Sequence, residues 1–189
     1  MAYLSVEQLN EIGFKHIGEN VQISDKAAIY NPELIEISDH CRIDDFCIVS
    51  GRVSIRRYCH ITPMCLLAGG EPGIEIGEFS TLAYGVKVFA QSDDYSGKTM
   101  VNSLIPKKYK NEVMSKVLIG RHCVLGTNSI VMPGVIISEG TSSGAMTLFN
   151  KDTSPWGIYV GSPAKRMKDR SQDLLKLEVE FNRESNDTI

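Results

Sequence analysis

The stretch that decides the fold runs from Ile119 to Leu148 and reads IGRHCV-LGTNSI-VMPGVI-ISEGTS-SGAMTL when it is divided into groups of six, here called hexads. Four of these five hexads open with an aliphatic residue, and a small or β-branched residue stands four places later in each. A period of six differs from the 3.6-residue period of a helix and from the alternation of a simple strand. A short fixed period of this kind predicts a chain that coils on itself in stacked turns.

The physical logic of the period predicts a parallel β-helix. Three hexads, about eighteen residues, close one triangular coil whose neighbours lie about 4.8 Å away. The first residue of a hexad points into the prism, and the fifth points inward near a corner, where a small side chain fits. The second and fourth places are expected in tight turns. Those turns suit glycine, which accepts positive φ, at Gly120, Gly126, Gly134 and Gly140.

The cysteines follow the same rule. All five occupy the fifth place of a hexad: Cys41, Cys47, Cys59, Cys65 and Cys123. Metal binding or disulfide bonding is the alternative, but Ala27, Ser80 and Ser129 fill the same place in other hexads. We therefore predict buried, reduced thiols that act as small apolar side chains. Reduced thiols are typical of a cytoplasmic protein.

Hexads can be followed back to Ile23, so the predicted β-helix covers residues 21–148 within one domain, 1–189. The pattern slips twice, by two residues before Ile37 and by three at a turn-rich bulge, AGGEPG. This bulge lacks the lysine of a phosphate-binding Walker motif.

Helices are expected at both ends of the chain. Ser5 and Gln8 form a capping-box pattern that predicts a short helix in an N-terminal cap, residues 1–20. A closing loop and a second helix, near 171–182, are expected within residues 149–189.

Composition excludes some classes of function. The formal charge of −3 and the isoelectric point near 5.8 give no reason to expect a nucleic-acid partner. No apolar run approaches the roughly 18 residues of a membrane span. The first residues lack the basic flank and apolar core of a signal peptide, so a cytoplasmic location is expected.

The hexads stop after Val88 and resume at Ile119, which predicts an excursion over residues 90–117. Irregular segments of this length in a compact domain are usually functional, although a disordered insertion is the alternative. Apolar residues in it, such as Tyr95 and Leu104, are expected to dock.

The hexads, the excursion and the closing string Gly161-Ser-Pro-Ala164 resemble the hexapeptide-repeat acyltransferases, nearest to the sugar O- and N-acetyltransferases of surface-polysaccharide biosynthesis. The resemblance implies an all-β solenoid, a left-handed parallel β-helix with a short N-terminal helix, one long excursion loop and a C-terminal helix. It implies direct attack of a sugar hydroxyl or amine, or that of a nucleotide-linked sugar, on the thioester of acetyl-CoA. It also implies a homotrimer whose active sites lie in grooves between two prisms.

The coenzyme positions carried over from the family are mostly small residues of the last coils: Gly126, Thr127, Ser143, Gly144 and Ala145. Their backbone groups would hold the thioester. Lys165 and Arg166 stand where family members hold coenzyme phosphates, and a solvated basic run is the alternative. No metal is expected.

The general base is the point at which the chain departs from the family. Galactoside acetyltransferases use a histidine shortly after the coil that precedes the excursion, and that place holds Asp93 here. His60, in the sixth place of its hexad, is the histidine best placed to line a groove, on the same face as Thr81 one coil away. Asp93 or Asp94 would orient His60 or act as the base. The missing histidine favours an amine acceptor or a His60–Asp pair.

Two other functions fit the same fold. A γ-type carbonic anhydrase needs three zinc-bound histidines, and only His60 and His122 stand on coils with suitable separation. A catalytically inactive structural subunit is the second alternative. Binding of acetyl-CoA would favour the acyltransferase over the structural subunit.

Overall fold

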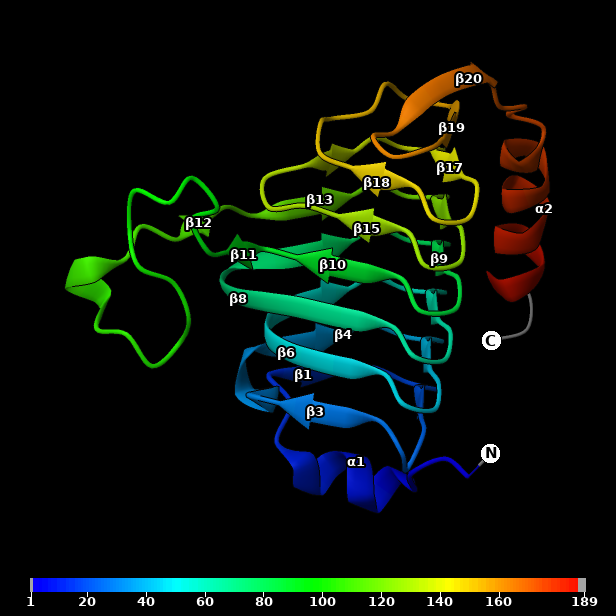
Figure 1. The fold of residues 1–189 in the computed structure, drawn as a ribbon. Coiled ribbons are helices and arrows are strands. Elements are labelled where there is room, and N and C mark those ends of the chain that lie inside the picture. The colour runs from blue at the N-terminus through cyan, green and yellow to red at the C-terminus, as the bar shows by residue number, and fades with distance from the viewer. Residues whose placement is uncertain (1, 187–189) are drawn as a thin grey trace.

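The computed structural model describes residues 2–186. It is a left-handed parallel β-helix of about seven turns, which confirms the predicted fold class. Figure 1 shows α1 (Val6–Ile12) across the N-terminal end of the prism and α2 (Leu174–Asn186) along one side. The excursion projects from the opposite side (Figure 1). Residues 187–189 of the predicted closing region lie outside the described residues.

The N-terminal helix forms where the capping box predicts. The Ser5 hydroxyl accepts from the Gln8 amide at 3.3 Å, and the Gln8 side chain accepts from the Ser5 amide at 2.9 Å. The helix ends at Gly13, whose φ of 82° suits glycine. Leu9 is the buried residue of the helix and packs onto the open end of the core. The coil starts before the expected residue 21, because β1 (His16–Ile17) already pairs with the next coil.

The prism has three faces of parallel strands. Face A carries β3 (Ala28–Tyr30), the first part of β6 (Ile48–Ile55), the first part of β8 (Leu66–Ile76), β10 (Lys87–Phe89), β15 (Ile130–Val131) and β18 (Leu148–Phe149). Face B carries β1, β4 (Ile35–Ile37), the second parts of β6 and β8, β13 (Val117–Ile119) and β16 (Ile136–Ile137). Face C carries β2 (Gln22–Ile23), β5 (Arg42–Ile43), β7 (His60–Ile61), β9 (Thr81–Leu82), β14 (Val124–Leu125), β17 (Ser142–Ser143) and β19 (Gly157–Val160).

The hexad register is confirmed by burial. First-place residues such as Ile43, Leu67 and Ile76 are fully buried and stack on their counterparts in adjacent coils. The excursion leaves the register intact, because Ile76 before it pairs with Ile119 after it. A long insertion is tolerated here because it enters and leaves at one corner of the prism.

The predicted use of glycine in the turns is confirmed at the fourth place, where Gly134 and Gly140 have φ of 82° and 69°, and is wrong at the second place, where Gly120 and Gly126 do not have positive φ. The fourth place is left-handed in most hexads, yet side chains occupy it at His40, Phe46, Tyr58, Met64, Phe79, His122, Asn128 and Met146. Glycine is needed at the second place for a different reason, because adjacent coils approach each other too closely there to leave room for a side chain. A Cβ on Gly120 would lie 2.6 Å from the Glu139 amide nitrogen, and one on Gly126 would lie 2.5 Å from the Gly144 carbonyl carbon.

The two slips of the hexad pattern become local structure. The first forms a 3-10 turn, η1 (Pro32–Leu34), before β4. The AGGEPG bulge is the bend in β8, which runs from face A to face B without interruption. Gly70 lies against Gly51 there, in a contact that leaves no room for a Cβ on Gly51.

The C-terminal helix packs along its own prism. Rings at the corner between faces B and C stack in a column, with centroids 4.7 Å apart for His40–Tyr58 and 5.2 Å for Tyr58–Phe79. Phe181 of α2 meets the Tyr58 ring edge-on at 5.1 Å. Glu178 accepts from His122 at 2.9 Å and pairs with Arg121, which fixes the helix to the column. β20 (Lys165–Asp169) folds back antiparallel on β19 and closes the last coil.

The five cysteines are free, and each is no more than 1% exposed, as predicted. Burial also raises the pKa of the Cys123 thiol to about 12, so its reactive thiolate is scarce at neutral pH. We expect thiol titration of the folded protein to find almost no reactive cysteine and titration in denaturant to find all five. Rapid labelling of several thiols in the folded protein would contradict the hexad register.

Candidate functional site

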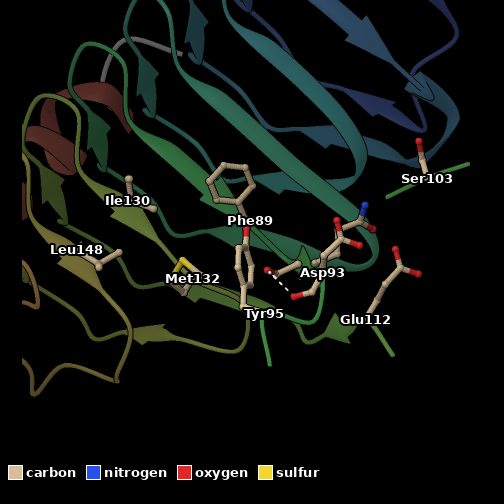
Figure 2. Close-up of a pocket in the computed structure, with 10 residues that line it drawn as sticks. Phe89, Asp93, Tyr95, Ser103, Glu112, Ile130, Met132 and Leu148 are labelled. Carbon is tan, nitrogen blue, oxygen red and sulfur yellow. Dashed lines mark hydrogen bonds between the residues drawn. The ribbon is translucent and has the colours of Figure 1, made fainter. Parts of the chain in front are cut away.

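A cleft of about 450 Å³ lies where the excursion meets the last coils of face A. Its apolar side is formed by outward side chains of β10, β15 and β18, together with the residue that directly follows β15. These side chains are Phe89, Ile130, Met132 and Leu148. Its polar side comes from the excursion, where Asp93, Ser103 and Glu112 line it. Figure 2 shows this division, with Tyr95 between Met132 and Asp93.

The polar side of the cleft is built on a short hairpin. β11 (Gln91–Ser92) pairs antiparallel with β12 (Val113–Met114), with Ser92 opposite Val113. Asp93 directly follows β11 and Glu112 directly precedes β12, so both carboxylates reach the cleft from the base of the excursion. The Asp93 side chain accepts from the Asn102 amide at 3.3 Å, which connects the hairpin to the outer loop.

The outer part of the excursion does not dock on its own chain as expected. Tyr95 and Leu104 are each 90% exposed. A 3-10 turn, η2 (Lys107–Tyr109), is the regular element of this outer loop. Two large apolar side chains therefore face solvent beside the cleft.

Asp94 does not line the cleft. Its carboxylate accepts from the Ser96 amide and from the Thr99 hydroxyl, both at 2.8 Å. These hydrogen bonds, with Ser96 first, hold the pKa of Asp94 below its usual value. The side chain thus shapes the loop that follows Asp93.

His60 lies on face C, and its register neighbour in the next coil is Thr81, as predicted. Within the chain its carboxylate partner is Asp44, at 2.8 Å from Nε2, rather than either aspartate of the excursion. The Asp44 side chain is 3% exposed and also accepts from Arg42 at 2.7 Å. Burial raises the pKa of Asp44, but the hydrogen bonds from Arg42 and His60 outweigh it, so the net shift is downward.

The predicted coenzyme positions gather at the corner between faces C and A, in two consecutive coils. Several of their polar groups are already used inside the prism. The Gly126 amide donates to the Ser143 hydroxyl at 2.9 Å, and the Gly144 amide donates to the Tyr159 carbonyl at 2.9 Å. Thr127 and Ala145 are exposed at the corner itself, three residues before the cleft residues Ile130 and Leu148.

Lys165 and Arg166 lie at the start of β20 and are exposed. Arg166 pairs with Asp169 at 2.8 Å and donates to the Pro155 carbonyl at 3.4 Å. Asp169 is 91% exposed, so this is a surface pair that a phosphate can displace.

Of the ten residues that line the cleft, sequence reasoning had assigned only Asp93 to the site, and it missed the other nine, among them Phe89 and Glu112. Phe89 occupies a second place in its hexad, which marks it as outward. Glu112 carries no such signal, because its position depends on the pairing of β11 with β12.

Residues 2–186 contain no group of histidine, cysteine or acidic side chains arranged to hold a metal ion. In the same described part of the chain, no helix is long and apolar enough to cross a membrane.

No family model matches the chain. A dTDP-4-amino-4,6-dideoxy-D-glucose acyltransferase of Escherichia coli is 40% identical over 184 residues, which are 96% of this chain and 95% of the relative. AntD, an N-acyltransferase from Bacillus cereus, superposes with a TM-score of 0.96 at 43% identity over 97% of this chain and 98% of AntD. Its solved complexes contain dTDP-4-amino-4,6-dideoxyglucose with coenzyme A, or dTDP with 3-hydroxybutyryl-CoA.

Other solved AntD structures carry a substitution at one aspartate or one serine. A maltose O-acetyltransferase from Clostridium difficile superposes with a TM-score of 0.56 at 19% identity, covering 89% of this chain and 78% of the other, which is a likeness of fold alone.

Proposed function

Because the chain belongs to the hexapeptide-repeat sugar acyltransferases, we propose that it transfers an acyl group from acetyl-CoA to the 4-amino group of a dTDP-linked 4-amino-4,6-dideoxy sugar. The predicted family and enzyme class are confirmed by the Escherichia coli relative and by AntD, each aligned over nearly the whole chain. The same two relatives support an amine acceptor and a dTDP group. In this chain, the observation that supports an amine acceptor is the lining of the cleft, which contains Asp93 and Glu112 but no histidine.

The chemistry fits these groups. The neutral amine attacks the thioester carbonyl, the C–N bond forms, and the C–S bond breaks when the tetrahedral oxyanion collapses. The acceptor enters as an ammonium and loses one proton to Asp93, which leaves the neutral amine that attacks. The nitrogen loses its second proton in the tetrahedral intermediate, and the departing thiolate gains it. Asp93 returns its own proton to solvent after the products leave. A carboxylate is a weak base for an alcohol, but an amine attacks in its neutral form and needs less help.

Acetyl-CoA suits the corner between faces C and A. Thr127 and Ala145 are exposed there, and among the described residues their N–H groups have no acceptor. Two such donors next to the cleft can hold the carbonyl oxygen of the thioester as it becomes an oxyanion. Gly126, Ser143 and Gly144 form the backbone of this corner. The amides of Gly126 and Gly144 already donate hydrogen bonds within the prism, so these residues support the site without binding the thioester.

Lys165 and Arg166 are proposed to bind the coenzyme phosphates. We expect Lys165→Ala and Arg166→Ala to weaken acetyl-CoA binding by about 1 kcal/mol each, less at high salt, because both contacts are exposed. Affinity for a coenzyme without its 3′-phosphate should change little. Lys176→Ala on α2, where the side chain is 83% exposed, is the control. Calorimetric titration with both coenzymes measures the difference, and equal losses for both would exclude this role.

We further propose a homotrimer with active sites between prisms. Face A presents apolar outward side chains: Ile48, Leu66, Phe89, Ile130, Met132 and Leu148. Face B instead carries ion pairs between coils, such as Arg56–Glu75 at 3.2 Å. A neighbouring prism against face A would cover the apolar side chains and give the cleft a second wall. Exposed Tyr95 and Leu104 could reach the same neighbour.

We retain one domain over residues 1–189 and a cytoplasmic location, which the five free thiols favour. The test of the proposed function is thiol release from acetyl-CoA with dTDP-4-amino-4,6-dideoxyglucose and with its 4-hydroxy counterpart. Release is expected with the amine and should be far slower with the alcohol. Binding of both ligands without thiol release would favour the structural-subunit alternative.

A further inference from the structure

Lys110 is an unusual residue for an exposed loop, because its side chain is only 6% exposed. The residues just before it, Lys107, Lys108 and Tyr109, are exposed. Burying an ammonium group is costly unless a negative group compensates it. Lys110 has such a group, since its Nζ lies 3.1 Å from a carboxylate oxygen of Glu112.

Glu112 lines the cleft from the same segment, which leads from η2 into β12. Residues two apart in an extended segment share a side, so Lys110 and Glu112 emerge together. The Glu112 side chain keeps 29% of its surface exposed, and it lines the cleft. One of its oxygens is bound to Lys110, which leaves the other free for a ligand.

The hairpin brings Glu112 and Asp93 to the same cleft. Ser92 with Val113 is the last pair of the hairpin, so Asp93 and Glu112 are the next residues outward, and both line the cleft. Two carboxylates that share one site repel each other. Lys110 offsets one of the two negative charges, so the group of three carries one net negative charge. That charge matches one ammonium.

We propose that Glu112, held in place by Lys110, is a second carboxylate that binds the acceptor's ammonium group opposite Asp93. The inference rests on the proposed amine acceptor. Glu112 contacts the substrate, and Lys110 acts through Glu112 as a positioning residue. Together they select an acceptor that carries a positive charge over one with a hydroxyl at the same place.

The experiment compares Glu112→Gln, Lys110→Met and Lys110→Arg with the wild-type enzyme. We expect Glu112→Gln to raise KM for the amino sugar about tenfold or more, as for loss of a hydrogen bond between charged groups, while kcat changes less. Lys110→Met should also raise KM for the amino sugar, whereas Lys110→Arg, which keeps the positive charge, should leave KM near the wild-type value. Glu180→Gln, on the exposed surface of α2, is the matched control.

A second readout separates positioning from a general structural role. Calorimetry with dTDP alone should give the same affinity in all variants, whereas the preference for the 4-amino over the 4-hydroxy sugar should fall in Glu112→Gln and Lys110→Met. An unchanged preference, or equal weakening of dTDP binding, would overturn this inference. A wild-type enzyme that fails to acylate the amine would instead overturn the proposed function.

Discussion

Replacement of Asp93 by asparagine is expected to lower kcat for the amino sugar by about 10²-fold or more, the usual range for loss of a general base. Asp93 is an aspartate that lines the cleft, and it stands at the end of β11 where the apolar floor begins. Asparagine keeps the size of the side chain and the oxygen that accepts from Asn102, so the loop should persist. Binding of acetyl-CoA should be unchanged.

The matched control is Asp94→Asn. Its carboxylate is occupied by Ser96 and Thr99 and lies outside the cleft lining, so near-normal turnover is expected. His60→Ala tests the alternative base, which would have to reach the cleft of a neighbouring chain from face C. If His60→Ala abolishes turnover while Asp93→Asn preserves it, the proton acceptor is the histidine. If the two act as one unit, the double variant should be no worse than the worse single variant.

Charged residues on face A and at its edge are expected to abolish assembly and activity together. Ile48 on face A and Met64 at the corner between faces C and A are 40% and 62% exposed in the single chain, so lysine at both places should leave the fold intact. Both lie in coils below the cleft floor, because Ile48 pairs with Leu66 and Leu66 with Lys87. A cleft without its second wall misplaces the substrate, and small misplacements can cost about 10²-fold in rate.

Light scattering and turnover measure the two effects. The Ile48→Lys, Met64→Lys double variant should run as one chain of 20.9 kDa, whereas the wild-type protein should run as three. Val179→Lys places the same charge on an apolar residue of α2 that is 50% exposed, and it should change neither property. A wild-type monomer with full activity would refute the trimer.

Much of the fold follows from the sequence because the size of each side chain shows its place in the hexad. Ile43, Ile61 and Leu82 had to point inward, and Cys47 and Cys65 had to be small. The roles of the turn residues did not follow. Left-handed turns with Tyr58 or Phe79 cost backbone energy that stacking of their rings offsets, and stacking depends on what the adjacent coil presents.

The candidate site was less predictable, because some of its residues are placed by the hexad repeat and others by strand pairing or local hydrogen bonds in the excursion. Asp93 could be placed by counting hexads. Glu112 could not, since its position follows from a two-residue antiparallel pairing inside an irregular excursion. Asp94 has the same chemistry as Asp93, and only its hydrogen bonds to Ser96 and Thr99 distinguish the two. The partner of His60 is Asp44, 16 residues earlier in the chain, which the sequence analysis did not consider because only the stacking of adjacent coils brings the two together.

The most direct test of the central claim is the chemical identity of the product. Wild-type protein is incubated with acetyl-CoA and dTDP-4-amino-4,6-dideoxyglucose, and the nucleotide sugar is recovered and examined by mass spectrometry before and after treatment with alkaline hydroxylamine. The account predicts a gain of one acetyl group that survives this treatment, because an amide resists it. A product that loses its acetyl group, as an ester does, or no acetylated product at all, would contradict it.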